Sequence, residues 1–255
     1  MDSRSAVNMF MAAVSGLIAG LALFMIYLVQ TRLSFTLVLL LWFLFLFWSA
    51  RFFSFEKKNI VLHYSTAVAF VSLQSLVEWK SLHIFLSVLN AAVFVFLWYW
   101  SARAQESETG VQFKTWRRVL MILWVFNVYS WSTALFALHI FFENLPFALL
   151  AGIGACFGTL GAGMIWNLYF KGHMRTFGPW FFVVALIVAE LMWVMRQLPF
   201  GYLAMGFLLS WIWYLVQLFI RFHLSEQGIL WKKQRLFLAL NTVLYGVVLY
   251  VARWI

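Results

Sequence analysis

Residues 181 to 195 read FFVVALIVAELMWVM, an apolar run in which Glu190 carries the only charge. A soluble core rarely needs so long an apolar segment, whereas a helix that crosses a bilayer does. A charged side chain at the centre of such a helix costs about 2.5 to 3.5 kcal/mol on insertion scales. We therefore interpret the run as part of a transmembrane helix, and Glu190 as its most informative residue.

The rest of the chain has the same apolar character. Its 255 residues are 65% hydrophobic and 10% charged, and the mean hydropathy is +0.92, whereas soluble domains carry about 25% charged residues. Windows of about 20 apolar residues predict about nine membrane spans. Lipid offers the backbone no hydrogen-bond partners, and the runs lack the alternation of a membrane barrel, so the spans should be helices. The predicted spans are 7–30, 34–50, 60–77, 82–102, 118–142, 146–170, 179–198, 201–221 and 236–254.

We therefore predict an all-α, polytopic integral membrane helix bundle that forms one transmembrane domain over residues 1–255. The basic residues predict its orientation. Of the eighteen lysines and arginines, all but four lie in the N-terminal tail or in the loops after the second, fourth, sixth and eighth spans. The four on the opposite side are Arg32, Lys80, Arg196 and Arg253. The positive-inside rule then places the N-terminus in the cytoplasm and the C-terminus outside the cytoplasmic membrane.

Loop lengths predict how the helices pair. The outer connections, around Arg32, Trp79, Asn144 and Gln197, are only a few residues long, while an inner one extends from Ser101 to Trp116. Short connections join antiparallel neighbours. We expect four outward hairpins and a final single helix.

One internal repeat is visible, at an offset of 53 residues. Leu145, Pro146, Phe147, Leu150 and Ala151 recur as Leu198, Pro199, Phe200, Leu203 and Ala204. The repeat suggests a duplication of approximately residues 118–170 and 171–223, as in transporters built from parallel repeats. Proline at a first helical turn and common apolar residues explain the same pattern equally well, so both interpretations stay open.

The composition excludes several classes of function. Asp2 is the only aspartate and Cys156 the only cysteine, which rules out paired-aspartate enzymes, internal disulfides and thiolate metal clusters. No phosphate loop or metalloprotease motif is present, and the basic residues form no groove-sized cluster for nucleic acid. We predict no metal, no cofactor and no nucleic-acid partner, and we assign no catalytic residue.

Glu190 should have polar neighbours if it has a function. It lies at about the depth of Ser130 in the span 118–142, where Asn127, Ser130 and two alanines recur at helical spacing. Trp193 follows Glu190 by three residues and shares its helix face. We therefore predict a ligand site formed by Glu190, Trp193, Asn127 and Ser130. The alternative is a structural hydrogen bond between helices, worth about 0.6 kcal/mol.

The glycines of one span and the tryptophans inside several spans can each be interpreted in two ways. We favour helix packing for both and keep a functional role as the alternative. The span 146–170 carries many glycines, which let helix backbones approach closely but could also line a cavity. Tryptophans inside the spans either pack as aromatic bulk or stack on a planar or isoprenoid ligand. The glycines are Gly152, Gly154, Gly158, Gly161 and Gly163, and the tryptophans are Trp124, Trp131, Trp193, Trp211 and Trp213.

The leading hypothesis is a multi-pass cytoplasmic-membrane protein that binds or transports a small apolar or lipid-like molecule. The ligand would occupy an aromatic pocket between the fifth, seventh and eighth spans, with Glu190 as its polar anchor. Two alternatives remain: a structural subunit of a membrane complex, and an intramembrane enzyme with Glu190 as general acid or base. Membrane lipids and partner subunits or further copies of the chain are the expected partners.

Overall fold

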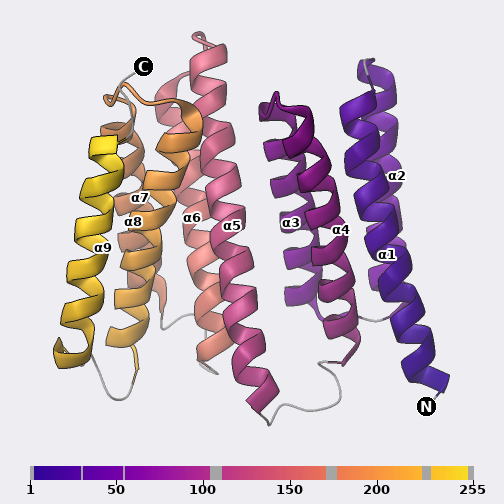
Figure 1. Cartoon of the computed structure of the whole chain (residues 1–255). Coiled ribbons are helices and arrows are strands. Elements are labelled where there is room, and N and C mark those ends of the chain that lie inside the picture. Colours follow the sequence, from indigo (N-terminus) through magenta and orange to yellow (C-terminus); the bar gives the residue numbers. More distant parts are fainter. Residues whose placement is uncertain are drawn as a thin grey trace. The chain divides into compact units, whose positions relative to one another are not determined.

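A computed structural model describes residues 3–29, 31–53, 55–103, 111–170, 177–225 and 231–251. Side chains are described at 7–29, 31–53, 55–101, 115–170, 177–225, 231 and 234–250. These ranges hold nine α-helices and no strand (Figure 1), which confirms the all-α prediction. The helices are α1 (Ser3–Leu28), α2 (Arg32–Phe52), α3 (Lys57–Leu76), α4 (Lys80–Arg103), α5 (Val111–Phe141), α6 (Phe147–Tyr169), α7 (Gly178–Met195), α8 (Tyr202–His223) and α9 (Trp231–Val251).

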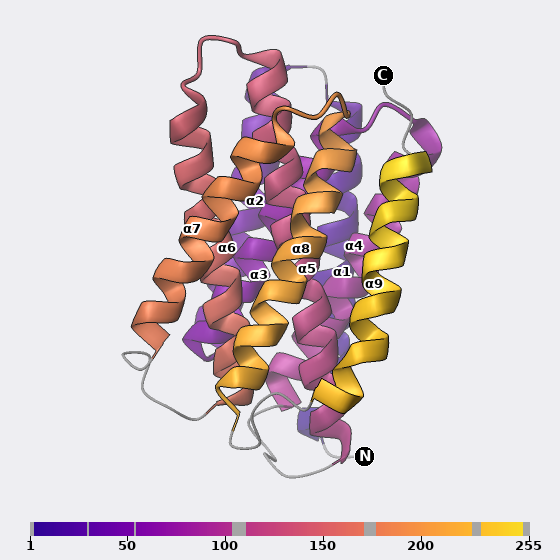
Figure 2. The ribbon, with the colours of Figure 1, turned by 90° about the vertical axis from the view of Figure 1, so that its left-hand side faces the viewer.

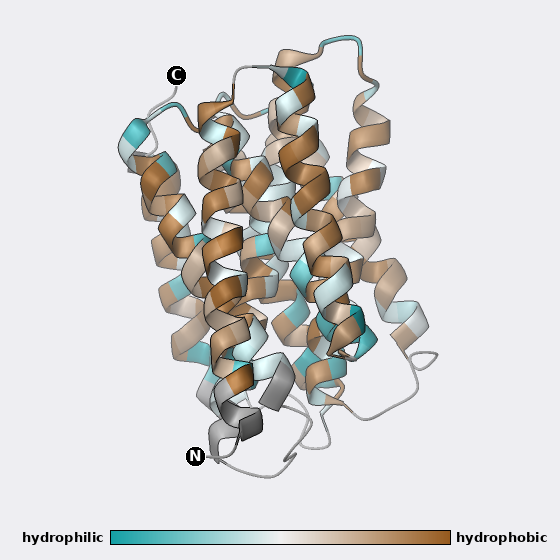
Figure 3. Ribbon diagram, turned by 90° about the vertical axis from the view of Figure 1, so that its right-hand side faces the viewer, coloured by the Kyte–Doolittle hydropathy of each residue, from teal (hydrophilic) through white to brown (hydrophobic). Residues whose placement is uncertain are grey.

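Seven of these helices are long and apolar enough to cross a membrane: α1, α2 and α4 to α8. Apolar residues cover most of their length in Figure 3. We expected nine spans, and α3 is a described helix that falls short. It is less apolar because its inner face carries buried polar side chains, among them His63, Thr66 and Gln74. In α9 the longest run of described side chains, Gln234–Tyr250, is itself apolar.

The helices form two compact units, Met1–Val119 and Leu120–Ile255. In the N-terminal unit, α1 packs most closely on α4. A Cβ atom placed at Gly16 would lie 2.6 Å from the carbonyl oxygen of Ala91, and one at Gly20 would lie 2.9 Å from the Cβ of Ala91. Only glycine fits so near a neighbouring helix, so these two residues allow the closest contact of the unit.

In the C-terminal unit, α6 lies against three other helices (Figure 2), and its glycines make the contacts. Gly154 faces Met192 of α7, Gly158 faces Val188 of α7, and Gly161 faces Val128 of α5. The favoured interpretation of these three glycines, close helix packing, is therefore confirmed. Helix α8 approaches α5 through Gly206, where an added Cβ would lie 2.9 Å from both the Cα and the N of Thr133.

The connections that we expected to be short are short: 29–31, 77–79, 142–146 and 196–201. Helix α5 begins at Val111, seven residues before the predicted span, and its Trp116 stacks on Trp100 of α4 with ring centroids 4.1 Å apart. Lys171 and Arg175, two of the inner basic residues, lie outside the described residues. Orientation, membrane placement and the internal repeat stay predictions.

Gly206→Ala should destabilise the protein, because the new methyl group meets backbone atoms of Thr133 that cannot move aside. We expect a loss of about 1 to 3 kcal/mol, as for overpacked sites. Gly152→Ala is the matched control, since nothing lies within 4 Å of its added Cβ, and it should gain up to about 1 kcal/mol from helix propensity. Thermal unfolding in detergent measures both, and equal stability of the two variants would contradict the close approach.

Reporter fusions test the orientation and the crossing by α9 together. We expect green fluorescent protein to fluoresce when fused after residue 225, because the positive-inside rule places that loop in the cytoplasm. Alkaline phosphatase should be active when fused after residue 255. Phosphatase activity at both positions, or at neither, would show that α9 does not cross the membrane.

Candidate functional site

Glu190 lies on the outer flank of α7. The buried side of this helix is formed by Val184, Val188, Met192 and Met195. Position 190 follows Val188 by two residues, a rotation of about 200° around the helix axis, and the Glu190 side chain is exposed. The carboxyl group therefore points away from α6, on which the buried side of α7 packs.

Trp193 belongs to an aromatic and cationic cluster at the end of α7. Its ring is 51% exposed and meets the ring of Phe147 edge to face at 5.5 Å. The guanidinium of Arg196 lies 4.8 Å from the centroid of Phe147 and 5.9 Å from that of Trp193. The ring of Phe147 also contacts the ring of His139, with the centroids 4.8 Å apart. Cation–π attraction holds such a cluster together.

Asn127 and Ser130 are fully buried on α5. The hydroxyl of Ser130 donates to the carbonyl oxygen of Phe126 at 2.9 Å, one turn earlier in the same helix. The structure therefore does not bring the four predicted residues together. Counting residues from the helix ends predicts that Glu190 and Ser130 lie at the same depth. It does not predict how each helix is rotated about its axis, and α7 is rotated so that Glu190 faces outward.

The buried tryptophans of this unit pack between its helices. Trp124, Trp131 and Trp213 are between 0% and 6% exposed. The indole N–H of Trp213 donates to the carbonyl oxygen of Gly158 at 3.0 Å, and that of Trp166 donates to the carbonyl oxygen of Gln217 at 3.3 Å. Both donors cross from one helix to another, so these rings fix α6 against α8.

A groove lies between α6 and α7, with a volume of about 570 Å³. Small side chains form its floor, and larger apolar ones form its walls. Phe182 of α7 and Leu160 of α6 are 71% and 42% exposed, so the groove is open to the surroundings of the helix pair. Its lining consists of Ala155, Cys156, Thr159, Leu160, Gly163, Met164, Phe181, Phe182 and Ala185.

The contacts of α6 with α7 fix where Glu190 lies along this groove. Gly154 faces Met192 and Gly158 faces Val188, so position 156 on α6 is level with position 190 on the antiparallel α7. Cys156 lines one end of the groove. The Glu190 carboxyl group is therefore level with that end, on the adjoining flank of α7.

This chain matches no known protein family, no curated protein and no solved structure. Within the described ranges, no three His, Cys, Asp or Glu side chains are grouped so as to hold a metal ion. The function must therefore be argued from the helix surfaces themselves. Sequence reasoning kept a cavity wall as the alternative meaning of the glycines. Gly163 contributes to the groove lining, and it also packs closely, since an added Cβ there would lie 2.9 Å from the Phe181 ring. The remaining groove residues carried no signal of their own, since alanine and phenylalanine are common throughout the chain.

Trp213→Phe should destabilise the protein by about 2 kcal/mol, since it removes the hydrogen bond to Gly158 and leaves a void. Trp193→Phe is the control, because this ring is half exposed and its nitrogen has no role in the core. Thermal unfolding of both variants checks this. An equal loss of stability in the two variants would contradict a specific contribution of the Trp213 hydrogen bond to stability.

Proposed function

We propose that this protein is a multi-pass membrane protein that binds a small apolar or lipid-like molecule in the groove between α6 and α7. The observation that carries the proposal is the groove itself. Its volume of about 570 Å³ lies within the range of about 300 to 1,000 Å³ that is usual for ligand sites. Because seven helices are apolar enough to cross a membrane, a groove open at their surface faces acyl chains, from which such a ligand enters.

The lining favours a hydrocarbon chain. Its only side-chain polar groups are the thiol of Cys156 and the hydroxyl of Thr159, and a thiol behaves as a small hydrophobe. The Thr159 hydroxyl oxygen is buried and makes no hydrogen bond within the described residues. From Gly163 to Cys156 the floor extends over seven residues, or about 10 Å of helix. An alkyl or isoprenoid chain fits such a site, and a charged molecule does not.

Glu190 lies level with one end of this groove. It is the only acidic residue within the described helices, and it is on the outer flank of α7, outside the groove lining. A ligand long enough to leave the groove at that end would place a hydroxyl or amine beside its carboxyl group. Glu190 thus keeps the role of polar anchor, while Trp193, Asn127 and Ser130, which lie away from the groove lining, do not enter this version of the site. Nothing in the arrangement favours transport over binding.

A second candidate is a subunit that joins a partner helix through the exposed flank of α7. Phe182, Leu186, Glu190 and Trp193 follow one another along this flank, and all four are exposed. A carboxyl group on a lipid-facing surface is rare and usually pairs with another group. Leu186→Cys in a Cys156→Ser background tests this candidate: oxidative cross-linking to a second chain would favour it over ligand binding.

The enzyme alternative gains no support from the described residues. General acid–base chemistry on a lipid substrate needs a second acid or a nucleophile beside Glu190. The other described glutamates, Glu56, Glu78 and Glu143, lie outside the helices.

Cys156 gives a direct test of the groove, because it is the only cysteine and is exposed. We expect dodecanol or geranylgeraniol to slow the reaction of Cys156 with N-ethylmaleimide at least severalfold in nanodiscs. Ala185→Phe should fill the groove and abolish this protection. Leu186→Phe is the matched control, because the next residue points to the exposed flank of α7. Protection of Cys156 that persists in Ala185→Phe, or no protection by either alcohol, would contradict the proposal.

A further inference from the structure

Several buried side chains of the N-terminal unit carry a polar atom that makes no hydrogen bond within the described residues. Four of them, one from each of the helices α1 to α4, border the same two aromatic clusters. They are the hydroxyl oxygen of Ser15, the indole nitrogens of Trp42 and Trp98, and Nε2 of His63. None of the four is more than 4% exposed. A buried polar group without a partner costs about 1 to 3 kcal/mol, so four in one interior require an explanation.

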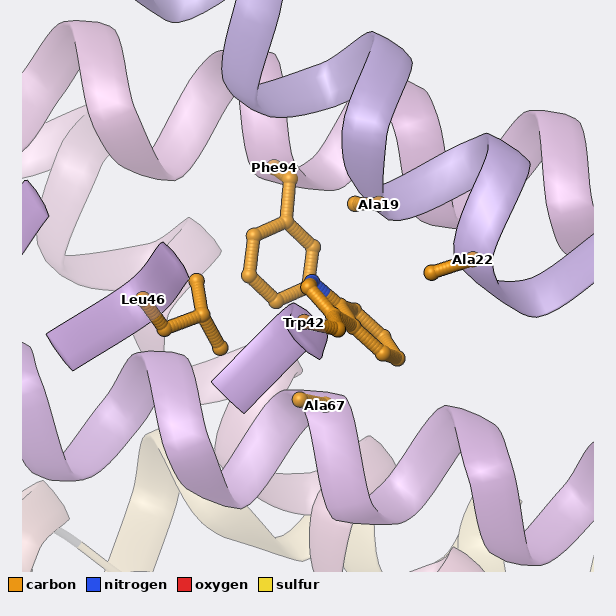
Figure 4. Close-up of a cluster of buried hydrophobic side chains, with 6 residues drawn as sticks. All are labelled: Ala19, Ala22, Trp42, Leu46, Ala67 and Phe94. Atoms are coloured by element: carbon orange, nitrogen blue, oxygen red, sulfur yellow. The ribbon is translucent and has the colours of Figure 1, made fainter. Parts of the chain in front are cut away.

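The three rings of this set share two phenylalanines as neighbours. The His63 ring stacks on Phe55 at 5.6 Å and meets Phe94 edge to face at 6.0 Å. Phe55 is also 4.8 Å from the Trp98 ring, and Phe94 is 5.5 Å from the Trp42 ring. Figure 4 shows the indole nitrogen of Trp42 on the side of that ring nearest Phe94. His63 therefore shares one neighbouring ring with each tryptophan.

Ser15 lies on the same interior from the side of α1. Ala12, three residues before it, packs in the cluster of Trp98, and Ala19, four residues after it, packs in the cluster of Trp42. Residues at these spacings share one face of a helix. The Ser15 hydroxyl thus lies within one turn of both clusters.

The hydrogen-bonding role of each atom follows from its chemistry. Nδ1 of His63 lies 2.7 Å from the carbonyl oxygen of Asn59. A carbonyl oxygen can only accept, so Nδ1 carries the proton and Nε2 presents a lone pair. The indole nitrogens of Trp42 and Trp98 can only donate, while the Ser15 hydroxyl can do either. The set offers two donors, one acceptor and one hydroxyl.

We propose that helices α1 to α4 bind a hydroxyl group at this point, which donates to Nε2 of His63 and accepts from an indole N–H. A hydroxyl both donates and accepts, whereas a carbonyl leaves His63 unpaired and an ammonium group leaves the indoles unpaired. An anion cannot donate to Nε2 of His63, and an ammonium group cannot accept from an indole, so the ligand is uncharged. It is a membrane-soluble phenol or alcohol, or water itself. The site is separate from the α6–α7 groove and does not depend on it.

The first test compares p-cresol with p-xylene, which has the same shape but no hydroxyl group. We expect p-cresol to raise the Tm of the full-length protein in detergent more than p-xylene does. His63→Leu should weaken the p-cresol affinity about tenfold, because the ligand hydroxyl then loses the acceptor that Nε2 of His63 provides. His63→Gln, which restores an acceptor, should recover part of that loss. Tyr64→Phe is the control: it removes a hydroxyl that donates to the carbonyl oxygen of Phe43 at 3.2 Å.

The second test separates water from an organic hydroxyl. If p-cresol has no advantage, a high-resolution map with ordered density within hydrogen-bond distance of His63 Nε2 supports water as the bound molecule, and His63→Leu should then lower the Tm. The proposal is overturned if p-cresol has no advantage, the map shows no such density, and His63→Leu is at least as stable as the parent. That result is the one expected when a buried acceptor simply lacks a partner.

Discussion

A helix surrounded by lipid gains little by exchanging an acyl chain for a leucine, so helices associate only where their surfaces fit closely. In this chain, glycines provide that fit. Gly16 and Gly20 let α1 approach α4, and Gly206 lets α8 approach α5. Helix α6 contributes three more contacts of this kind, and two of them, at Gly154 and Gly158, orient α7 and thereby decide that Glu190 faces outward. The groove depends on the same contacts, because it lies beside them.

Packing of this kind leaves polar groups with few choices of partner. In the C-terminal unit, buried indoles donate to carbonyl oxygens of other helices, as Trp213 does to Gly158. In the N-terminal unit, a buried side chain also donates a hydrogen bond to another helix: the amide nitrogen of Asn90 donates to the carbonyl oxygen of Ala19 at 2.9 Å. Both units keep buried polar atoms that have no partner within the described residues: the indole nitrogen of Trp131 and the side-chain amide of Gln217 in the C-terminal unit, and the groups around His63 in the N-terminal unit.

The helical fold and most helix positions could be predicted from the sequence, because apolar runs of the required length leave few alternatives. The start of α5 could not, since residues 111–117 alternate polar and apolar types and extend the helix beyond its continuous apolar part. The rotation of each helix about its own axis could not be predicted from the sequence either. Predicting that Glu190 faces Ser130 required knowing which side of α7 is buried, and an almost uniformly apolar helix gives no periodic signal. The contacts of Gly154 and Gly158 decide it, and they depend on a second helix.

The two helices with the weakest apolar character have a consequence for how the protein is made. Helix α3 carries a polar inner face, and α9 carries Asn241, whose side-chain oxygen accepts a hydrogen bond from the indole of Trp211 on α8 at 3.0 Å. Such segments are poor substrates for the translocon when they emerge alone from the ribosome. Each has an earlier neighbour that pairs with one of its polar groups: Gln74 of α3 donates to the carbonyl oxygen of Leu23 on α1 at 3.4 Å, and Asn241 of α9 pairs with α8. Biosynthesis of this chain is therefore expected to retain earlier helices beside the exit site until their weaker neighbours have joined them.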